Sequence, residues 1–195
     1  MLNTFRNTLL IFNSSRNKKM DKNFSNLVAD NLCLRQIVPT DINNIYLGLS
    51  HPEIIKYYGV SYDSLSATQS QMRWYKALEE NRTGIWWAIV DLKQNIFYGA
   101  IGFNNISTIH QKAEIGFWLL PAYWGKGIMK NALQLACTYG FNELKLHRIE
   151  ALVETANSNS KKLLEKLSFA HEGTLVDYEI KNNNFISLDS YAKFH

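Results

Sequence analysis

The sequence contains little cysteine and no long hydrophobic run. Its 195 residues include two cysteines, Cys33 and Cys137, which lie far apart in apolar stretches. Two cysteines are too few for a cysteine-rich zinc site, and no His-x-x-x-His spacing supplies further ligands. We therefore expect no metal, and buried thiols in a reducing compartment. No apolar run approaches the roughly 20 residues that a membrane span needs. These absences predict a cytoplasmic protein without a membrane partner.

An excess of charge is also absent from most of the chain. The net charge is +4, but residues 1–19 alone contain four basic residues and no acidic one, and the remaining 17 basic and 17 acidic residues cancel. No basic face or nucleic-acid partner is therefore expected. Residues 1–19 faintly resemble a transit peptide; the alternatives are a disordered tail or an upstream start codon, with Met20 as the true start. We expect such a tail, followed by one domain over residues 30–195.

The body of the chain alternates between strand-like and helix-like patterns. Hydrophobic residues make up 46% of the sequence, enough for a core. Strands at 85–91, 97–104 and 113–119 have short links, which predicts antiparallel pairing. A helix at 126–141 then leads to a strand at 148–154, which predicts a parallel pair with a right-handed crossover. The other predicted elements are strands at 32–38, 169–178 and 185–194, and helices at 39–49, 64–80 and 158–167, with a short one from residue 51. The pattern indicates an α/β (α+β type) fold, with a mixed, mainly antiparallel sheet of about six to seven strands flanked by helices.

A glycine turn connects the strand at 113–119 to the next helix. Pro121 prevents the strand from continuing, and Gly125 and Gly127 allow a tight turn that exposes backbone N–H groups. The first N–H groups of a helix lack internal partners, and together with the positive helix end they favour a phosphate. Gly-x-x-x-x-Gly-Lys-Ser/Thr is absent, which excludes a P-loop. Lys130 stands where a dinucleotide fingerprint needs its third glycine. On the Gly-x-Gly pattern alone, a purely structural turn is the alternative.

Two ordered runs resemble the acetyl-CoA site of the GNAT superfamily of acetyltransferases. The first comprises Ala113-Glu-Ile-Gly-Phe-Trp-Leu and Tyr123-Trp-Gly-Lys-Gly-Ile-Met. The second is Asn157-Ser-Asn-Ser-Lys-Lys-Leu-Leu-Glu-Lys-Leu-Ser-Phe, followed by Glu172-Gly-Thr-Leu. The similarity covers roughly residues 30–194 and is strongest to the branch that includes ribosomal-protein N-terminal acetyltransferases. The residues that this resemblance assigns to acetyl-CoA binding are Phe117, Trp118, Leu119, Trp124, Gly125, Lys126, Gly127, Ile128, Met129, Asn157 and Ser160.

The sequence departs from the general family pattern at two places. Trp124 stands where a Gln or Arg is usual, and Met129 where a Gly or Ala is usual, although the ribosomal-protein branch is similar here. Many family members carry a tyrosine in the later helix as general acid, where this chain has Leu164, and Ser168 replaces the usual glycine before the following Phe. A tyrosine-acid mechanism is therefore not expected from that helix.

The resemblance implies direct acetyl transfer from acetyl-CoA, the acyl-donor substrate, to a primary amine. Glu114 is the candidate base, and a surface partner for a lysine is its alternative reading. Ser160 is the candidate donor near the sulfur, and an ordinary first-turn residue is the alternative. Asn157 either contacts the pantetheine arm, as the resemblance implies, or only caps its helix. Lys161 and Lys162 either reach a phosphate or form a solvated face.

The acceptor amine is the least determined part of the hypothesis. Deprotonating a lysine at pH 7 costs about 4–5 kcal/mol, against about 1 kcal/mol for an α-amine, which favours a protein N-terminus. The alternatives are a small-molecule acetyltransferase for polyamines or aminoglycosides, which an acid-rich pocket would favour, and a non-catalytic acyl-CoA-binding module. Acceptor specificity is expected in residues 50–82 and 104–112. The sequence is compatible with a monomer or a homodimer.

Overall fold

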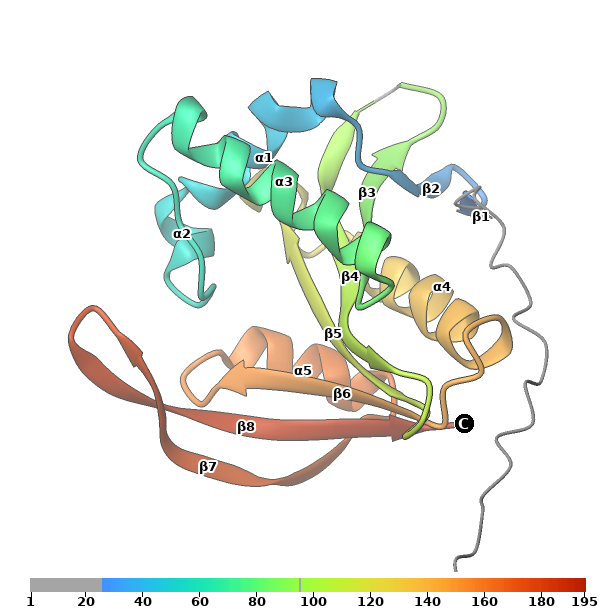
Figure 1. The fold of residues 1–195 in the computed structure, drawn as a ribbon, viewed down its shortest axis with the longest axis vertical. Coiled ribbons are helices and arrows are strands. Elements are labelled where there is room, and N and C mark those ends of the chain that lie inside the picture. Colours follow the sequence, from blue (N-terminus) through green and yellow to red (C-terminus); the bar gives the residue numbers. More distant parts are fainter. Residues whose placement is uncertain (1–25, 95) are drawn as a thin grey trace, which may run out of the picture.

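The computed structural model describes residues 26–94 and 96–195, which form a single sheet with helices on both faces (Figure 1). Within these residues the sheet has eight strands in the order β1-β2-β3-β4-β5-β6-β8-β7. The strands are β1 Leu27–Ala29, β2 Leu32–Gln36, β3 Ile85–Asp91, β4 Phe97–Ser107, β5 Lys112–Leu119, β6 Arg148–Glu154, β7 Ala170–Lys181 and β8 Asn184–Phe194. The α-helices are α1 Ile42–Leu49, α2 Pro52–Ile55, α3 Leu65–Asn81, α4 Ile128–Asn142 and α5 Ser158–Lys166. Short 3-10 helices span Pro39–Asp41 and Pro121–Tyr123.

The mixed, mainly antiparallel architecture expected from the sequence is confirmed, with one more strand than the expected six to seven. The additional strand is β1, which pairs antiparallel with β2, so the sheet begins before the expected boundary at residue 30. Its three residues are too few to show the alternation by which a strand is recognised. The expected tail at residues 1–19 lies outside the described residues.

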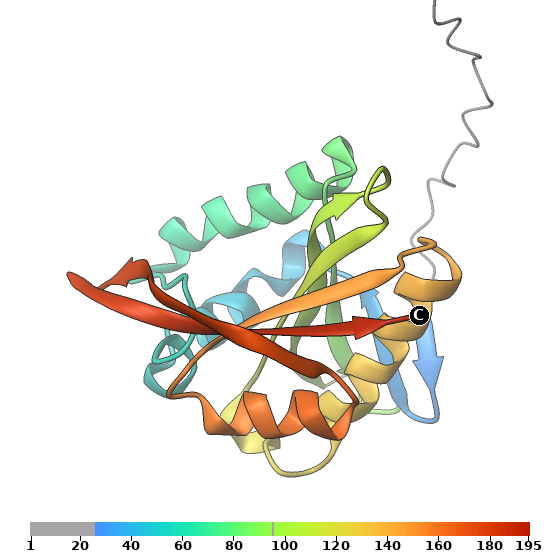
Figure 2. The same ribbon diagram turned by 90° about the horizontal axis from the view of Figure 1, so that it is seen from below.

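Successive residues of β3 supply the two cores on opposite faces of the sheet. Trp87 packs toward α4, where its ring meets Tyr139 edge-on at 5.4 Å between centroids. Trp86 packs toward α3, where its ring lies 5.5 Å from that of Tyr75. Figure 2 shows α3 on one side of the sheet and α4 and α5 on the other. The two cores follow from the period of two in a strand, because neighbouring side chains must point to opposite faces.

The parallel pair β5–β6 separates soon after it forms. The two strands are in register only from Lys112 opposite Arg148 to Glu114 opposite Glu150. In contrast, β5 remains paired with β4 as far as Leu119. Among residues 26–94 and 96–195, no strand therefore pairs with the β6-side backbone edge of β5 beyond Glu114.

The C-terminal hairpin does not continue the parallel pairing of β5 with β6. β8 lies between β6 and β7 and pairs antiparallel with both, so β7 becomes the edge of the sheet. Asn182 and Asn183 form its two-residue turn with φ of +50° and +61°, a conformation typical of tight hairpins. The hairpin projects past the ends of β5 and β6 toward α2 (Figure 1).

Both cysteines are buried and free, as expected. Cys33 lies on β2 and Cys137 on α4. Burial raises the pKa of the Cys137 thiol to about 12, so this thiol remains protonated at neutral pH.

Candidate active site

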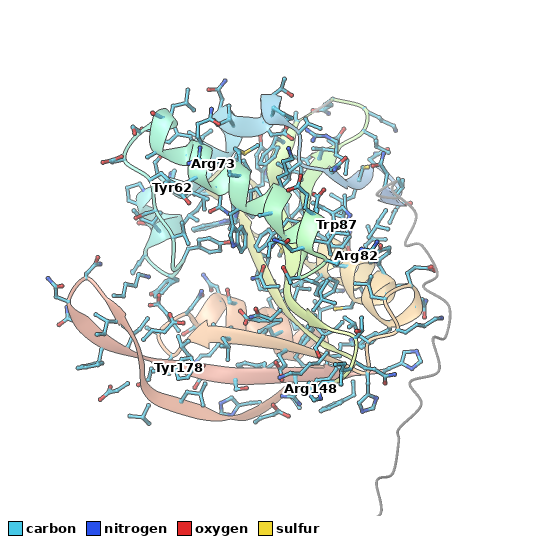
Figure 3. All side chains as sticks on the ribbon, viewed as in Figure 1. Tyr62, Arg73, Arg82, Trp87, Arg148 and Tyr178 are labelled. Atoms are coloured by element: carbon cyan, nitrogen blue, oxygen red, sulfur yellow. The ribbon has the colours of Figure 1, made fainter. Side chains whose placement is uncertain are left out.

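A cavity of about 730 Å³ lies where β5 and β6 separate. Its size is within the usual range for small-molecule sites. Its walls come from the segment after α2, from α3, from β5 and β6, from the start of α5 and from the β7–β8 hairpin. Figure 3 shows Tyr62, from the α2–α3 segment, and Tyr178, from β7, on opposite sides of this region.

Two strand glycines make room for the aromatic floor of the cavity. A Cβ atom at Gly102 would lie 2.3 Å from the Trp86 ring, and one at Gly116 would lie 3.0 Å from it. The Trp86 indole can therefore lie flat across β4 and β5, where its N–H donates to the side chain of Asn104 at 2.8 Å. Asn104 lies opposite Glu114 in the β4–β5 pair, so the Trp86 ring and the candidate base Glu114 lie on neighbouring positions of the cavity wall.

Glu114 lines the cavity from the last position at which β5 pairs with β6. Its carboxylate accepts a hydrogen bond from the side-chain amide of Asn105 at 3.3 Å, and no ion pair to it forms within the described residues. Burial, the largest cause, raises the pKa of Glu114, and the charges of Glu150 and Glu179 raise it further. The alternative reading was a surface partner for a lysine; Lys112, two positions earlier on β5, binds Glu150. A carboxylate with a raised pKa accepts a proton more readily at neutral pH.

The start of α5 brings Asn157 and Ser160 to the same cavity. The Asn157 side chain caps the helix by accepting from the backbone N–H of Ser160 at 3.1 Å. Lys161 does not reach outward, because its ammonium group donates to the carbonyl of Thr155 at 2.7 Å and to the buried carboxylate of Asp189 at 3.0 Å. These contacts fix the connection between β6 and α5 and thereby the position of Ser160.

The glycine turn lies beyond the far end of β5 and forms the geometry expected of it. Gly125 and Gly127 have φ of +72° and +76°, and a Cβ at either position would meet no atom within 4 Å. The first helical bond of α4 runs from Asn131 N–H to the Gly127 carbonyl, so the N–H groups of Ile128 to Lys130 precede it. No side chain among the described residues caps this end. The turn thus presents exposed backbone donors at a positive helix end.

Several of the sequence-predicted binding residues have side chains engaged elsewhere. Trp118 packs against Gly48 of α1, Leu119 and Met129 belong to the core on the α4 face, and the Trp124 indole donates to the Leu119 carbonyl at 2.7 Å. Any contact of Trp118, Leu119 and Met129 with a ligand would therefore come from their backbone groups.

Of the predicted residues, Glu114, Phe117, Asn157 and Ser160 line the cavity together. The turn residues 124–129 do not line it. The backbone edge of β5 from Phe117 to Leu119 connects the cavity with the turn, and on this edge the Leu119 carbonyl already accepts from the Trp124 indole. One elongated ligand lying along this edge could contact both.

The cavity is also lined by side chains that the sequence did not assign to a site, among them Glu154 and Glu179. Strands β5, β6 and β7 bring Glu114, Glu154 and Glu179 to its walls, and no Lys, Arg or His lines it within the described part of the chain. The aromatic lining residues are Tyr57, Tyr58, Tyr62, Trp74, Trp86, Phe117 and Tyr178. Burial raises the pKa of Tyr58 well above its ordinary value, so its hydroxyl stays neutral beside Glu114. Carboxylates and aromatic faces without basic groups favour a cationic ligand.

Glu154 and Glu179 carried no signal in the sequence, because the three acids of the cavity are far apart in the chain. The expected acceptor segment 50–82 does contribute the residues from Tyr57 to Trp74. The contribution of β7 was missed, because the expected strand ended at residue 178 and a bulge between Leu175 and Glu179 breaks its alternation.

Residues 31–170 match the family model described as the acetyltransferase (GNAT) domain. A Bacillus subtilis protein named as the uncharacterized N-acetyltransferase YoaA is 34% identical over 170 residues, covering 87% of this chain and 96% of that protein. The chain therefore belongs to the GNAT acetyltransferase family and is an N-acetyltransferase, which confirms the resemblance and the enzyme class predicted from the sequence.

Solved structures show the same fold at lower identity. A ribosomal L7/L12 alpha-N-protein acetyltransferase, RimL, in complex with coenzyme A has a TM-score of 0.78 and 22% identity, covering 87% of this chain and 98% of that one. A spermidine N-acetyltransferase from Vibrio cholerae, in complex with CoA and spermine, has a TM-score of 0.75 and 24% identity, covering 84% and 95%. The two proteins differ in acceptor, so the shared fold leaves the acceptor open.

Two further properties bear on the site. Within residues 26–94 and 96–195, no group of three or more His, Cys, Asp or Glu side chains is arranged to hold a metal ion. None of the helices in the same residues is both long and apolar enough to cross a membrane.

Proposed function

We propose that the protein transfers the acetyl group of acetyl-CoA to a primary amine that enters the aromatic and acidic cavity. The proposal rests mainly on one observation. Where β5 separates from β6, the edge of β5 runs from a cavity that contains the Glu114 carboxylate to the glycine turn. The turn would bind the pyrophosphate through the N–H groups at the start of α4. The edge of β5 from Phe117 to Leu119 would pair with the pantetheine amides as an added strand does, except at the Leu119 carbonyl, which accepts from the Trp124 indole.

Glu114 would act as the base in this reaction. The ammonium group of the acceptor loses a proton to Glu114, directly or through water, and the free amine attacks the thioester carbonyl. The new C–N bond forms as the C–S bond breaks, and the products are the acetamide and the thiol of coenzyme A. The raised pKa of Glu114 supports this role, because proton transfer is most efficient when the pKa of the base lies near the working pH.

Ser160 would supply the donor for the departing thiolate. Its backbone N–H is occupied by Asn157, which leaves its hydroxyl oriented by the first turn of α5 at the cavity wall. The family position often held by tyrosine is Leu164, which is fully buried in the core, so that position contributes no proton donor here. The second proton of the amine would reach the thiolate through the Ser160 hydroxyl or water.

A protein N-terminal α-amine is the first candidate acceptor. It needs little help to lose its proton, since its pKa is about 8 against about 10.4 for a lysine. The cavity is partly open to solvent, so a polypeptide acceptor could extend from it without passing through the core.

A polyamine is the second candidate, and it is favoured by Glu114 and Glu179, the two carboxylates of the cavity that have no ion-pair partner among the described residues. Glu179 has no ion-pair partner within the described residues and could bind a second positive charge while Glu114 receives the reacting amine. Aminoglycosides, which also carry several ammonium groups, belong to the same class of acceptor.

The test is acetyl-CoA turnover measured as thiol release with N-terminal peptides, polyamines and aminoglycosides, together with calorimetry for acetyl-CoA alone. We expect binding and turnover with at least one class of amine. Absence of binding at millimolar acetyl-CoA would refute the proposal, and binding without thiol release across all amines would support a non-catalytic module instead. Glu179→Gln should raise the KM for a polyamine about tenfold, an amount typical of one charge-assisted contact, and leave that for a peptide α-amine unchanged.

A further inference from the structure

Lys181, the last residue of β7, connects three segments that are distant in the sequence. Its ammonium group donates to the carbonyl oxygen of Lys56, just after α2, at 2.6 Å. The same group lies 2.5 Å from the carboxylate of Glu154, the last residue of β6. One side chain therefore joins the hairpin, the α2 segment and the end of β6.

The ion pair is largely shielded from water, which makes its geometry specific. The side chains of Lys181 and Glu154 are 19% and 15% exposed. Charges removed from water are held in place strongly only when their geometry and hydrogen bonds are good, and Lys181 meets that condition by also donating to a backbone carbonyl.

Few other contacts hold the hairpin to the α2 segment. Among the described residues, the bond from Lys181 to the Lys56 carbonyl is the one hydrogen bond between the two. A second cavity, of about 380 Å³, is lined by both segments and shares Tyr58 and Gly59 with the larger one. The second cavity therefore lies between the hairpin and the α2 segment, and Lys181 provides the hydrogen bond that joins them.

The residues next to each end of this attachment form the acceptor side of the main cavity. Tyr57 and Tyr58 follow Lys56, and Tyr178 and Glu179 precede Lys181; all four line the cavity. Glu154 lines it as well, with its charge compensated by Lys181.

We infer that Lys181 is a positioning residue that determines acceptor specificity. It sets the distance between the tyrosines that follow α2 and Tyr178 of the hairpin, and it limits the uncompensated carboxylates of the cavity to Glu114 and Glu179. It does not touch the acetyl-CoA edge of β5. This inference rests on the proposed function, because the cavity must receive the amine.

The kinetic test compares Lys181→Met with the conservative Lys181→Arg, using the acceptor with the highest turnover. Lys181→Met should raise the acceptor KM about tenfold, as loss of one charge-assisted contact does, while kcat and the KM for acetyl-CoA change less than about twofold. Lys181→Arg should restore most of the affinity.

Two further variants test whether the effect comes from the position of the hairpin, from the freed charge of Glu154, or from a general loss of stability. Lys181→Met combined with Glu154→Gln removes the freed carboxylate, and its acceptor KM should remain raised because the hairpin is still detached. Lys166→Met changes an exposed lysine at the end of α5 and should leave all parameters unchanged. An unchanged acceptor KM in the double variant, or an equal rise of both KM values, would overturn the inference.

Hydrogen exchange of the protein without substrates tests the attachment even if no amine is acetylated. Lys181→Met should accelerate exchange in residues 56–62 and 176–186 and leave α4 unchanged. Equal exchange in the wild type and the variant would refute the role of Lys181, whereas wild type without turnover would refute only the proposed function.

Discussion

The glycine turn and the acceptor wall are built from the chain in opposite ways. The turn occupies residues 124–127, and its proposed ligand contacts are backbone N–H groups at the start of α4. The acceptor wall combines side chains from the α2–α3 segment, from β6 and from the hairpin, which lie up to 125 positions apart in the contact between Lys56 and Lys181. A backbone site depends on local conformation, whereas a side-chain site depends on how distant elements pack.

The two regions also differ in how the family model covers them, because the glycine turn lies inside the match. The match to the GNAT domain ends at residue 170, so Tyr178, Glu179 and Lys181 of the hairpin lie beyond it. Loops and edge elements are where specificity usually varies on a common scaffold. We therefore expect changes at the turn to abolish cofactor binding and changes at the wall to alter the choice of amine.

The largest effect should come from Gly127→Glu. Its φ of +76° strains any side chain, and the new carboxylate would repel a phosphate at the helix end. Affinity for acetyl-CoA in calorimetry should fall at least about a hundredfold. Asn183→Glu is the matched control, because it also introduces a carboxylate at an exposed position with positive φ, in the β7–β8 turn. The affinity of this variant for acetyl-CoA should be unchanged. Wild-type affinity in Gly127→Glu would remove the turn from the site.

Glu114→Gln should have the next largest effect, on kcat rather than on acetyl-CoA binding. Loss of a general base lowers kcat by about a hundredfold. The wild-type rate should fall as pH decreases through the raised pKa of Glu114, and the variant should lack this acidic limb. A full pH–rate profile for both proteins checks this, and an unchanged rate and profile would contradict the assignment.

The same variant also gives a prediction about stability. Because folding raises the pKa of Glu114, the ionised carboxylate destabilises the fold, and Glu114→Gln should be more stable at pH 7. The gain should disappear below the ordinary carboxyl pKa, where Glu114 is protonated in both states. Glu172→Gln is the control of opposite sign, since the hydrogen bond from Arg148 lowers the pKa of Glu172. Denaturant unfolding at several pH values measures both.

Ser160→Ala should have the smallest effect on catalysis. Loss of one donor to the thiolate should lower kcat about tenfold, with water replacing part of the role. Folding should be little affected, because Asn157 accepts from the Ser160 backbone, which the variant keeps. Ser158→Ala, in the same first turn but exposed, should retain the wild-type kcat. Equal kcat values in the wild type, Ser160→Ala and Ser158→Ala would contradict the assignment of Ser160 and indicate that water protonates the thiolate.

The sequence by itself determined the order of the elements, the glycine turn and the start of α5. Each of these depends on interactions within a few residues: positive φ at Gly125 and Gly127, a proline that ends a strand, and an Asn cap. Interactions of this short range can be predicted from residues that are neighbours in the sequence.

Only the tertiary structure decided the contents of the acceptor wall. Strand registers and the insertion of β8 between β6 and β7 bring Glu114, Glu154 and Glu179 together, and Gly102 and Gly116 admit the Trp86 ring only because β4 lies beside β5. Pairing between distant strands depends on the packing of the whole sheet, so no short stretch of sequence contains it. The bulge before Glu179 and the attachment of Lys181 to Lys56 are therefore visible only in the folded chain.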